Sequence, residues 1–362
     1  MSTNFFFKSL KVDNYRGLKN LNIESLRRVN LIGGLNGTGK STLLDAIFLF
    51  LDRRSPVALM RPFISRNLQA SFPNGLDYIF GSLGIDNSAT ISASTIQGEY
   101  NLSLSRGKPP SLAMNIAIGN NPLQQNQIHP TTIDPDQIGI HLTSTFNKKD
   151  DGAVWIVQTA QDAINFNMYR ASISPVVAGA YVSSTSRISP LEDAQRFSVL
   201  FKEKRLQEIV TALAFVNSDL ESFQLLQEGN QPTLYAVMKN GNLLQTSMLG
   251  GGFQSFLSIV LLLMATKDGV VLFDEVDAAI HYSKLSLFWS TIEKLAEQQN
   301  CQVFAVTHSR ECIEYALKGF TDMNKLADLQ YLRLENDDNE TDCISYSGEE
   351  LADAISDNWE IR

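Results

Sequence analysis

Long apolar runs, cysteine and positive charge are scarce in this sequence, and each shortage excludes a class of protein. No run approaches the roughly 18 apolar residues that span a bilayer, and the strongest candidate, residues 259–265 with its flanks, is predicted to be a buried helix. Residues 1–17 have neither a basic start nor a cleavage site, which predicts a strand and not a signal peptide. Cys301, Cys312 and Cys343 form no CxxC pair, which excludes a disulfide framework, argues against a cysteine zinc site and is typical of the reducing cytoplasm.

The charge balance weakens any grip of the whole chain on nucleic acid. Lysine and arginine number 30 against 39 acidic residues, a formal net charge of -9. A local basic patch from Lys148, Lys149, Lys202, Lys204 and Arg205 stays open. Internal repeats and long heptad runs are also absent, so coiled-coil arms are not expected.

What is present is the composition of a folded protein, 362 residues with 44% hydrophobic and 19% charged. Residues 5–26 alternate about a turn at 13–17, which predicts a hairpin. In the first half of the chain, the pattern then predicts a strand at 28–34, a helix at 40–52 and an antiparallel β-rich segment at about 71–157. A helix at 190–216 and a hairpin at 232–245, turning at Asn240 and Gly241, are predicted next. The rest of the chain is predicted to form a helix at 253–266, a strand at 269–275, a further helix, a strand at 301–309 and two more strands in the tail.

The stretch "GGLNGTGKST" joins the strand at 28–34 to the helix at 40–52. It matches G-x-x-x-x-G-K-[ST] as Gly34, Leu35, Asn36, Gly37, Thr38, Gly39, Lys40 and Ser41, followed by Thr42. Glycines let backbone N–H groups close around phosphate oxygens, the lysine reaches the β and γ phosphates, and the serine ligates Mg²⁺. The sequence therefore predicts a site for ATP and Mg²⁺.

A nucleoside triphosphatase also needs carboxylates for the metal and for the attacking water. "GVVLFDEVD" supplies them, because four apolar residues form a buried strand that ends at Asp274 and Glu275. We expect Asp274 to bind the metal with Ser41, and Glu275 to polarise the water. A solvated acidic strand end is the alternative.

Two further features lie in the same part of the chain. Gly250, Gly251 and Gly252 open an apolar helix, where backbone N–H groups can meet a phosphate. Taken alone they fit a flexible turn equally well, and their position before the carboxylate strand favours function. "CQVFAVTHSRE" places Thr307 and His308 at the end of a buried strand, where His308 can bond a γ-phosphate.

The three other histidines are interpreted according to the motifs around them. His281 follows the carboxylates closely enough to reach a partner subunit, whereas His129 and His141 have no motif around them and are interpreted as structural.

The order of these parts resembles the ABC-class ATPase heads of the RecF, SMC and OLD type. More closely, "NYRGLKNL", "GLNGTGKSTLLDAI", "MLGGGFQSFLSI", "FDEVDAAIHYS" and "QVFAVTHSRECI" are similar to compact bacterial AAA/OLD-like ATPases, which often serve as the ATPase half of abortive-infection or phage-defence pairs. The resemblance runs from about residue 5 to the end and is weakest in the β-rich middle.

The resemblance implies two heads that sandwich ATP, with residues 250–252 of one facing the γ-phosphate held by Lys40 of the other. It also implies that Arg16 lies near the nucleotide. ABC signatures usually carry serine where this chain has Gly250 and glutamine or an acid where it has Phe253, so only backbone contacts would remain there.

The resemblance also bears on where a nuclease activity would reside. OLD nucleases continue into a metal-binding TOPRIM domain, but only 54 residues follow His308 here. The acidic run "ENDDNETD" is predicted to be a solvated loop. Any nuclease or toxin is therefore expected on another protein.

We conclude that the sequence predicts an α/β P-loop NTPase fold like an ABC-ATPase head, with antiparallel β elements and a helical lobe. Residues 1–362 form a single head, in which 1–70 and 230–362 are the nucleotide-binding core and about 71–229 are a β-rich insert and helical lobe. The predicted function is a cytoplasmic, Mg²⁺-dependent ATP hydrolase that dimerises or forms a higher oligomer around ATP and controls an effector encoded nearby, with no membrane contact. The alternative is a RecF-like repair ATPase that binds DNA.

Overall fold

The computed structural model describes residues 5–53, 55, 88–107, 115–117, 128–129, 139–158, 164–170, 174, 177–182, 190–275, 280–337 and 340–361. Their strands form three sheets of six, nine and three strands. The β-rich character expected from residue 71 is found from residue 89 onward, and residues 56–87 lie outside the described residues. No helix in the described part of the chain has the length and apolar character needed to cross a membrane.

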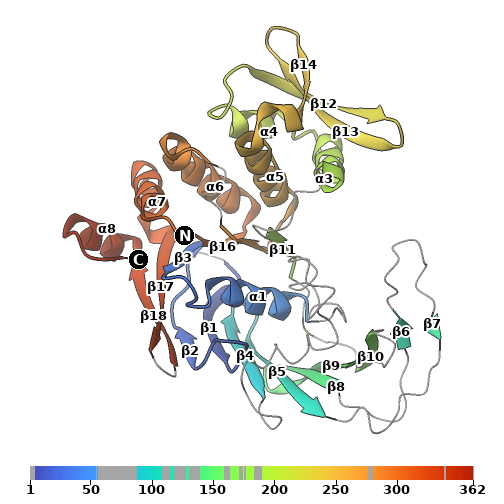
Figure 1. Cartoon of the computed structure of the whole chain (residues 1–362), viewed down its shortest axis with the longest axis vertical. Coiled ribbons are helices and arrows are strands. Elements are labelled where there is room, and N and C mark those ends of the chain that lie inside the picture. The colour runs from blue at the N-terminus through green and yellow to red at the C-terminus, as the bar shows by residue number, and fades with distance from the viewer. Residues whose placement is uncertain are drawn as a thin grey trace.

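The six-stranded sheet forms the centre of the molecule (Figure 1). Its order is β11 (Gly179–Val182), β15 (Val270–Phe273), β16 (Gln302–Val306), β3 (Val29–Gly34), β17 (Leu329–Asp337) and β18 (Glu340–Ser347). All neighbouring pairs are parallel except β17 with β18. The carboxyl ends of five strands therefore lie along one edge, which is where ligands bind in open parallel sheets.

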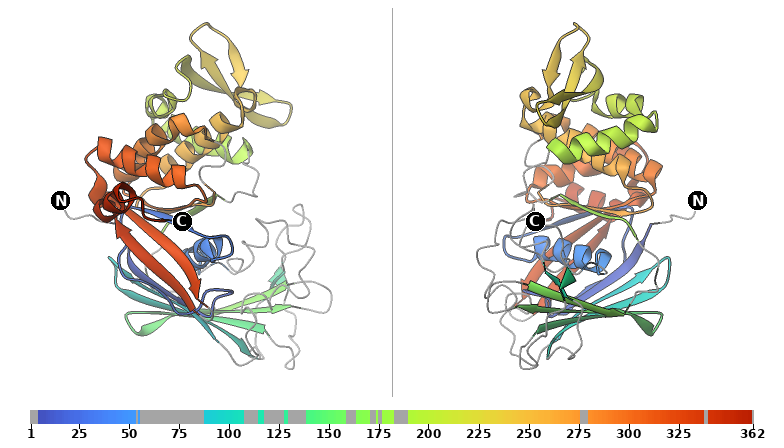
Figure 2. Two further views of the ribbon diagram at one scale, coloured as in Figure 1. Left: turned by 60° about the vertical axis from the view of Figure 1, so that its left-hand side comes forward. Right: turned by 90° about the vertical axis from the view of Figure 1, so that its right-hand side faces the viewer.

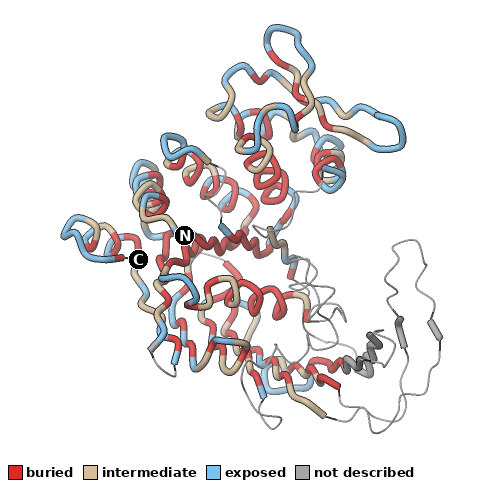
Figure 3. Tube along the Cα trace, in the orientation of Figure 1, coloured by how far each residue is buried: buried red, intermediate tan, exposed pale blue. Residues whose placement is uncertain are grey.

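Helices cover both faces of this sheet, and the alternation of side chains along each strand decides which core a residue joins. Val270 and Leu272 pack toward α1 (Lys40–Leu51), whereas Val271 and Phe273 pack toward the opposite layer. That layer contains α5 (Gly251–Ala265), α6 (Leu285–Gln299), α7 (Arg310–Asp322) and α8 (Gly348–Ser356). Figure 2 shows α1 and the helical layer separated by the sheet, and Figure 3 shows both cores as buried tube.

The nine-stranded sheet lies on the far side of α1 (Figure 2). Its order is β2 (Leu21–Ile23), β1 (Phe7–Asp13), β4 (Ala89–Thr95), β5 (Glu99–Gly107), β8 (Gly139–Phe146), β9 (Lys149–Gln158), β10 (Ile164–Arg170), β6 (Asn115–Ala117) and β7 (Ile128–His129). The predicted hairpin of β1 and β2 is confirmed. Because β1 also pairs with β4, the first two strands belong to this sheet, and the division predicted at residue 70 does not follow the sheet boundary.

A buried polar cluster fastens the end of α1 to the nine-stranded sheet. Arg53, just beyond the helix, donates to Ser174 Oγ at 2.6 Å and lies 3.5 Å from Asp151 Oδ2. Ser174 donates to both carboxylate oxygens of Asp151, and the guanidinium also lies over the ring of Tyr100. Since charges this deeply buried are costly unless paired and bonded, the cluster fixes the helix at this point.

A helical lobe continues the layer of α5. It contains α3 (Pro190–Lys202), α4 (Leu206–Leu213) and a small sheet of β12 (Leu220–Glu228), β13 (Gln231–Met238) and β14 (Leu243–Gln245). The predicted hairpin about Asn240 and Gly241 is confirmed. The single helix predicted at 190–216 is instead two helices, because Lys204 adopts φ 62°, which a continuous helix does not allow.

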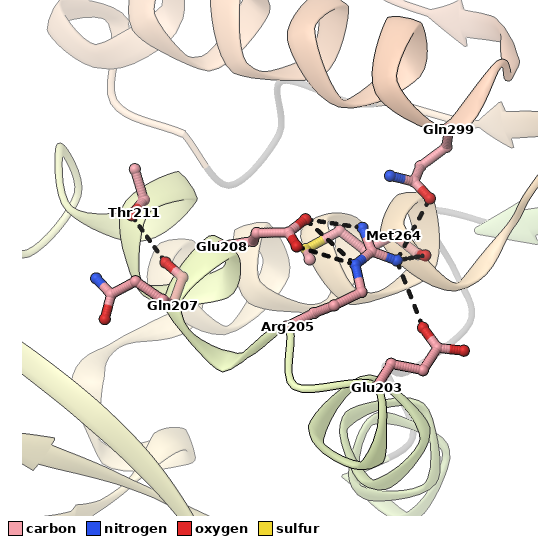
Figure 4. A network of polar contacts seen from close by, with 7 residues as sticks. All are labelled: Glu203, Arg205, Gln207, Glu208, Thr211, Met264 and Gln299. Carbon is pink, nitrogen blue, oxygen red and sulfur yellow. Dashed lines mark hydrogen bonds and ion pairs between the residues drawn. The ribbon is translucent and has the colours of Figure 1, made fainter.

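The basic patch left open by the sequence does not form. Lys148 turns between β8 and β9, while α3 lies at the other end of the molecule (Figure 1). Arg205 is held within the lobe, donating to Met264 O at 3.0 Å and to Glu208, with Glu203 3.7 Å away (Figure 4). Its charge is therefore neutralised by neighbours and does not project from a shared surface.

The acidic run near the C-terminus also differs from its prediction. Asn336 pairs with Thr341 and Asp337 with Glu340 in the β17–β18 ladder, so most of the run continues two strands and is not a loop. Charged residues are common on such a hairpin, because one face of an antiparallel pair can stay in water.

Candidate functional site

The loop between β3 and α1 has the geometry of a phosphate cradle. Gly34, Gly37 and Gly39 adopt φ of 130°, 83° and 94°, a region that favours glycine. A Cβ on Gly34 would lie 2.3 Å from the carbonyl oxygen of Leu334, so strand β17 leaves no room for a side chain there. The three glycines are thus needed for the turn, and Gly34 is needed for close packing as well.

Helix α1 begins directly at this loop and lacks a side-chain cap. Its N-cap is Gly39, no side chain in the described part of the molecule caps it by a hydrogen bond, and its first turn carries no acidic residue. The first N–H groups of a helix have no partner within the helix, and they carry the positive end of its dipole. The loop and helix together can therefore bind an anion.

Ser41 and Asp274 meet across the sheet edge. Ser41 Oγ donates to Asp274 Oδ1 at 2.9 Å, although the residues are 233 positions apart. In octahedral coordination two neighbouring oxygens, each about 2.0–2.1 Å from Mg²⁺, lie about 2.8–3.0 Å apart, so this oxygen pair already has the spacing of two magnesium ligands. The residues present fit the ion that the sequence predicts.

Lys40 lies inside the same loop. Its Nζ donates to the carbonyl oxygens of Gly34 at 2.8 Å and Leu35 at 2.7 Å, and the residue is 4% exposed. Burial lowers the pKa of Lys40, and the negative charge of Asp274 opposes that shift. The three residues on which the predicted site depends, Lys40, Ser41 and Asp274, are therefore gathered at one edge of the sheet.

The second carboxylate follows in an unusual backbone conformation. Glu275 has φ 53° and is exposed, whereas Asp274 beside it is 7% exposed. Left-handed conformation is uncommon outside glycine, asparagine and aspartate, and such residues cluster at functional sites. The turn directs consecutive carboxylates into different surroundings, one packed against Ser41 and one open to water.

Thr307 and His308 directly follow the neighbouring strand β16, whose end lies between the ends of β15 and β3. Thr307 is buried, its N–H donates to Ile32 O at 3.0 Å, and its Oγ1 accepts from the N–H of Ser309. His308 is exposed. The predicted position of His308 on the ligand edge is correct, and its role remains a prediction. His141, predicted to be structural, is half-buried in β8, where burial lowers its pKa.

Arg16 lies against α1, where it forms an ion pair with the fully buried Asp45. Tyr181 of β11 donates to the other carboxylate oxygen of Asp45 at 3.5 Å. Sequence reasoning did not identify Asp45 or Tyr181. The available signal was one acidic residue in the middle of an otherwise apolar helix, "KSTLLDAIFLFL".

Strand β17 braces the phosphate loop in a way that the sequence did not reveal. Asn336 donates through Nδ2 to the carbonyl oxygen of Gly37 at 3.2 Å. The hydroxyl of Tyr331 lies where a Cβ on Gly33 would stand, and it donates to the carbonyl oxygen of Ile361. No local pattern connects these positions, because they are brought together by strand pairing over about 300 residues.

The glycine-rich segment stands apart from the phosphate loop of the same chain. Gly250 has φ 93°, and α5 begins at Gly251 without a side-chain cap. Helix α5 precedes β15 and runs antiparallel to it, so its N-terminus lies toward the edge of the sheet at which the parallel strands end. It lies on the face of the sheet opposite α1 (Figure 2). These glycines are thus presented outward, toward whatever approaches that edge.

The fold and the site together define a P-loop ATPase head of the ABC class, of RecF/SMC type. In agreement, the family described as the RecF/RecN/SMC N terminal domain matches residues 6–326, and the chain belongs to this family. The resemblance seen in the sequence is confirmed at this level.

Several individual proteins are similar to the chain. A Helicobacter pylori protein named ATP/GTP phosphatase is 23% identical over 95% of this chain and 96% of its own length. The DNA replication and repair protein RecF of Cellvibrio japonicus is 42% identical over 83 residues, 23% of this chain and 21% of its own length. Among solved structures, an Smc head bound to the C-winged helix domain of ScpA is 14% identical with a TM-score of 0.49, covering 97% of this chain and 99% of that one.

Proposed function

We propose that this protein hydrolyses ATP with Mg²⁺ and uses the cycle as a switch that controls a partner protein. The observation that carries the proposal is the contact of Ser41 with Asp274 at 2.9 Å beside the buried ammonium of Lys40. A hydroxyl, a carboxylate and a lysine at the start of an uncapped helix are the groups that hold a metal-bound triphosphate.

Each residue has a defined task in this proposal. The ammonium group of Lys40 donates to the carbonyl oxygens of Gly34 and Leu35, and when ATP binds, phosphate oxygens replace these two acceptors. Ser41 and Asp274 hold Mg²⁺, which when bound neutralises charge on the phosphates. Glu275 orients a water molecule for attack on the γ-phosphorus and accepts its proton, while the bond from the γ-phosphorus to the bridging oxygen breaks and ADP leaves. The exposed position of Glu275 gives water access.

The same proposal assigns supporting roles to His308 and Arg16. His308 bonds the γ-phosphate from the neighbouring strand end. Arg16 lies near the nucleotide, consistent with its ion pair to Asp45 on the helix that begins at Lys40. We infer that two heads pair around ATP, with Gly250, Gly251 and Gly252 of one head meeting the nucleotide of the other through backbone N–H groups.

We further propose that the controlled partner is a nuclease or toxin encoded nearby, in a phage-defence pair of the OLD-like type. This rests on the sequence stretches around Arg16, Lys40, Gly250, Asp274 and His308. A neighbouring gene for a nuclease or toxin would support it, and a position among replication genes would contradict it.

Two substitutions test the ATPase proposal. We expect Lys40→Ala to abolish ATP binding, because the main cation facing the phosphates is lost. We expect Glu275→Gln to retain ATP but release phosphate slowly, and to stabilise the paired heads. Phosphate release and light scattering with and without ATP measure both results. A Glu275→Gln protein whose mass does not change with ATP would contradict the pairing of heads.

A second candidate is a RecF-like repair ATPase that clamps duplex DNA. It is favoured by local identity to two RecF proteins, 42% over 83 residues and 50% over 50 residues. The net charge of -9 opposes it. An ATP-dependent gel shift with duplex DNA that weakens with salt would support this alternative, and its absence would favour the switch.

A further inference from the structure

A cavity of about 350 Å³ lies where α5 and α6 begin, on the helical side of the central sheet. Three buried aromatic rings contribute to its lining, from Phe253, Phe256 and Phe288, together with the half-buried Phe215 and Ile280. This volume and this apolar lining are typical of a site that receives a ligand or a side chain.

The rim of the cavity is polar and rich in donors. Gly250 lies there with open space where a Cβ would stand, next to the uncapped N-terminus of α5. Lys284 is exposed on the same rim, and its Nζ donates to the carbonyl oxygen of Phe215 at 2.7 Å. His281 also contributes to the lining. The cavity therefore combines an apolar interior with a rim that favours negative charge.

Leu35 is an exposed apolar residue beside the site proposed for a negatively charged phosphate, so it complements the cavity and its rim. Its carbonyl oxygen accepts hydrogen bonds from Lys40 and Thr38 inside the phosphate loop, but the residue is 69% exposed. Among the described large apolar residues only Met248 is more exposed, at 73%, and it lies two positions before Gly250 on the cavity rim. An apolar side chain is thus held outward directly beside the place where a triphosphate would bind.

We propose that Leu35 of one copy of this chain inserts into the cavity of a second copy, an inference that rests on the proposed pairing of heads. Polarity and charge are complementary, because the apolar side chain meets the aromatic rings while the neighbouring bound triphosphate meets Lys284 and the start of α5. Within one chain the central sheet separates α1 from α5. A two-fold axis makes the contact twice, since each head carries both the side chain and the cavity.

A disulfide test locates the contact. In the Glu275→Gln background, Leu35→Cys is combined with Ile280→Cys in one chain, and mild oxidation with and without ATP is followed on non-reducing gels. A bond requires Cβ atoms about 4 Å apart, so it reports close approach. Leu35→Cys combined with Val199→Cys, an apolar residue 52% exposed on α3, is the matched control.

We expect ATP to raise the cross-linked dimer on the order of tenfold over that control, because pairing brings the thiols at 35 and 280, but not those at 35 and 199, within bonding distance. An ATP-dependent dimer by light scattering without the 35–280 cross-link would overturn this inference and leave the proposed pairing intact. No ATP-dependent dimer at all would overturn both.

A second variant measures the strength of the contact. Leu35→Ser should raise the dimer dissociation constant of the Glu275→Gln protein by on the order of tenfold for each of the two contacts, since burying a leucine side chain is worth that much in affinity. Val199→Ser should leave it unchanged. An equal effect of both substitutions would contradict the insertion of Leu35, and ATP binding by each variant is measured in parallel.

Discussion

Glu293 of α6 gives the sharpest test of how burial controls charge in this protein. The residue is 0% exposed, and neither carboxylate oxygen accepts a hydrogen bond from a described residue. Burial is the main cause that raises the pKa of Glu293 to about 7, and the negative charges of Glu297 and Asp328 add to it, while Lys325 and Arg28 oppose it. Nζ of Lys325 lies 3.9 Å away, because it pairs more closely with Glu297.

The folded protein therefore binds this proton more tightly than the unfolded chain does. The contribution of Glu293 to stability is most favourable below pH 4.5, decreases as the pH rises, and levels off above pH about 7. The change in pKa corresponds to about 3 kcal/mol at neutral pH, since each unit is worth about 1.4 kcal/mol. The glutamine of Glu293→Gln does not titrate. The unfolding free energy of this variant, relative to that of the natural protein, should therefore rise by about 3 kcal/mol between pH 4.5 and about 7.

Urea unfolding followed by circular dichroism at several pH values measures this difference. Glu311→Gln, which replaces an exposed carboxylate in the first turn of α7, is the control and should show no comparable pH-dependent gain. If the difference in unfolding free energy between Glu293→Gln and the natural protein is the same at every pH, the buried carboxyl does not titrate in this range and the reasoning from burial is wrong.

Three further substitutions test the supports of the site. Gly34→Ala should lower the unfolding free energy by about 1–3 kcal/mol through backbone strain. The added Cβ, 2.3 Å from the carbonyl oxygen of Leu334, should lower it further, and thermal melting measures the total loss. Arg16→Met should cost about 3–5 kcal/mol by leaving Asp45 charged and buried, and the double variant with Asp45→Leu should recover most of it in a double-mutant cycle. Ser347→Ala should cost about 1 kcal/mol, because it removes one half of the capping box of α8.

The parts of the site that lie next to one another in the chain could be predicted from the sequence. The loop around Lys40 and the strand that ends at Asp274 have local signatures, because each depends on a turn and a hydrophobic run of its own. Their meeting could also be predicted, since carboxyl ends of parallel strands share an edge. The contact of Ser41 with Asp274 confirms it.

The supports of the site could not be predicted in the same way. Asn336 reaches Gly37, and β1 joins the nine-stranded sheet, through strand pairing that leaves no trace in either local sequence. The basic patch that the sequence left open does not form, because Lys148 and α3 lie at opposite ends of the molecule (Figure 1), and because Arg205 is paired with Glu208 and bonded to the carbonyl oxygen of Met264. Charge counted along a chain says little about charge that folding has already paired.

Helix α1 has an uncapped start at the phosphate loop, a body enclosed between two sheets and an end fixed by Arg53. Because side chains in a protein interior interdigitate, a helix packed along its whole length cannot move without moving its neighbours. The phosphate loop and the cluster of Arg53, Ser174 and Asp151 therefore stand at the two ends of one packed strut, which ties the loop to the nine-stranded sheet.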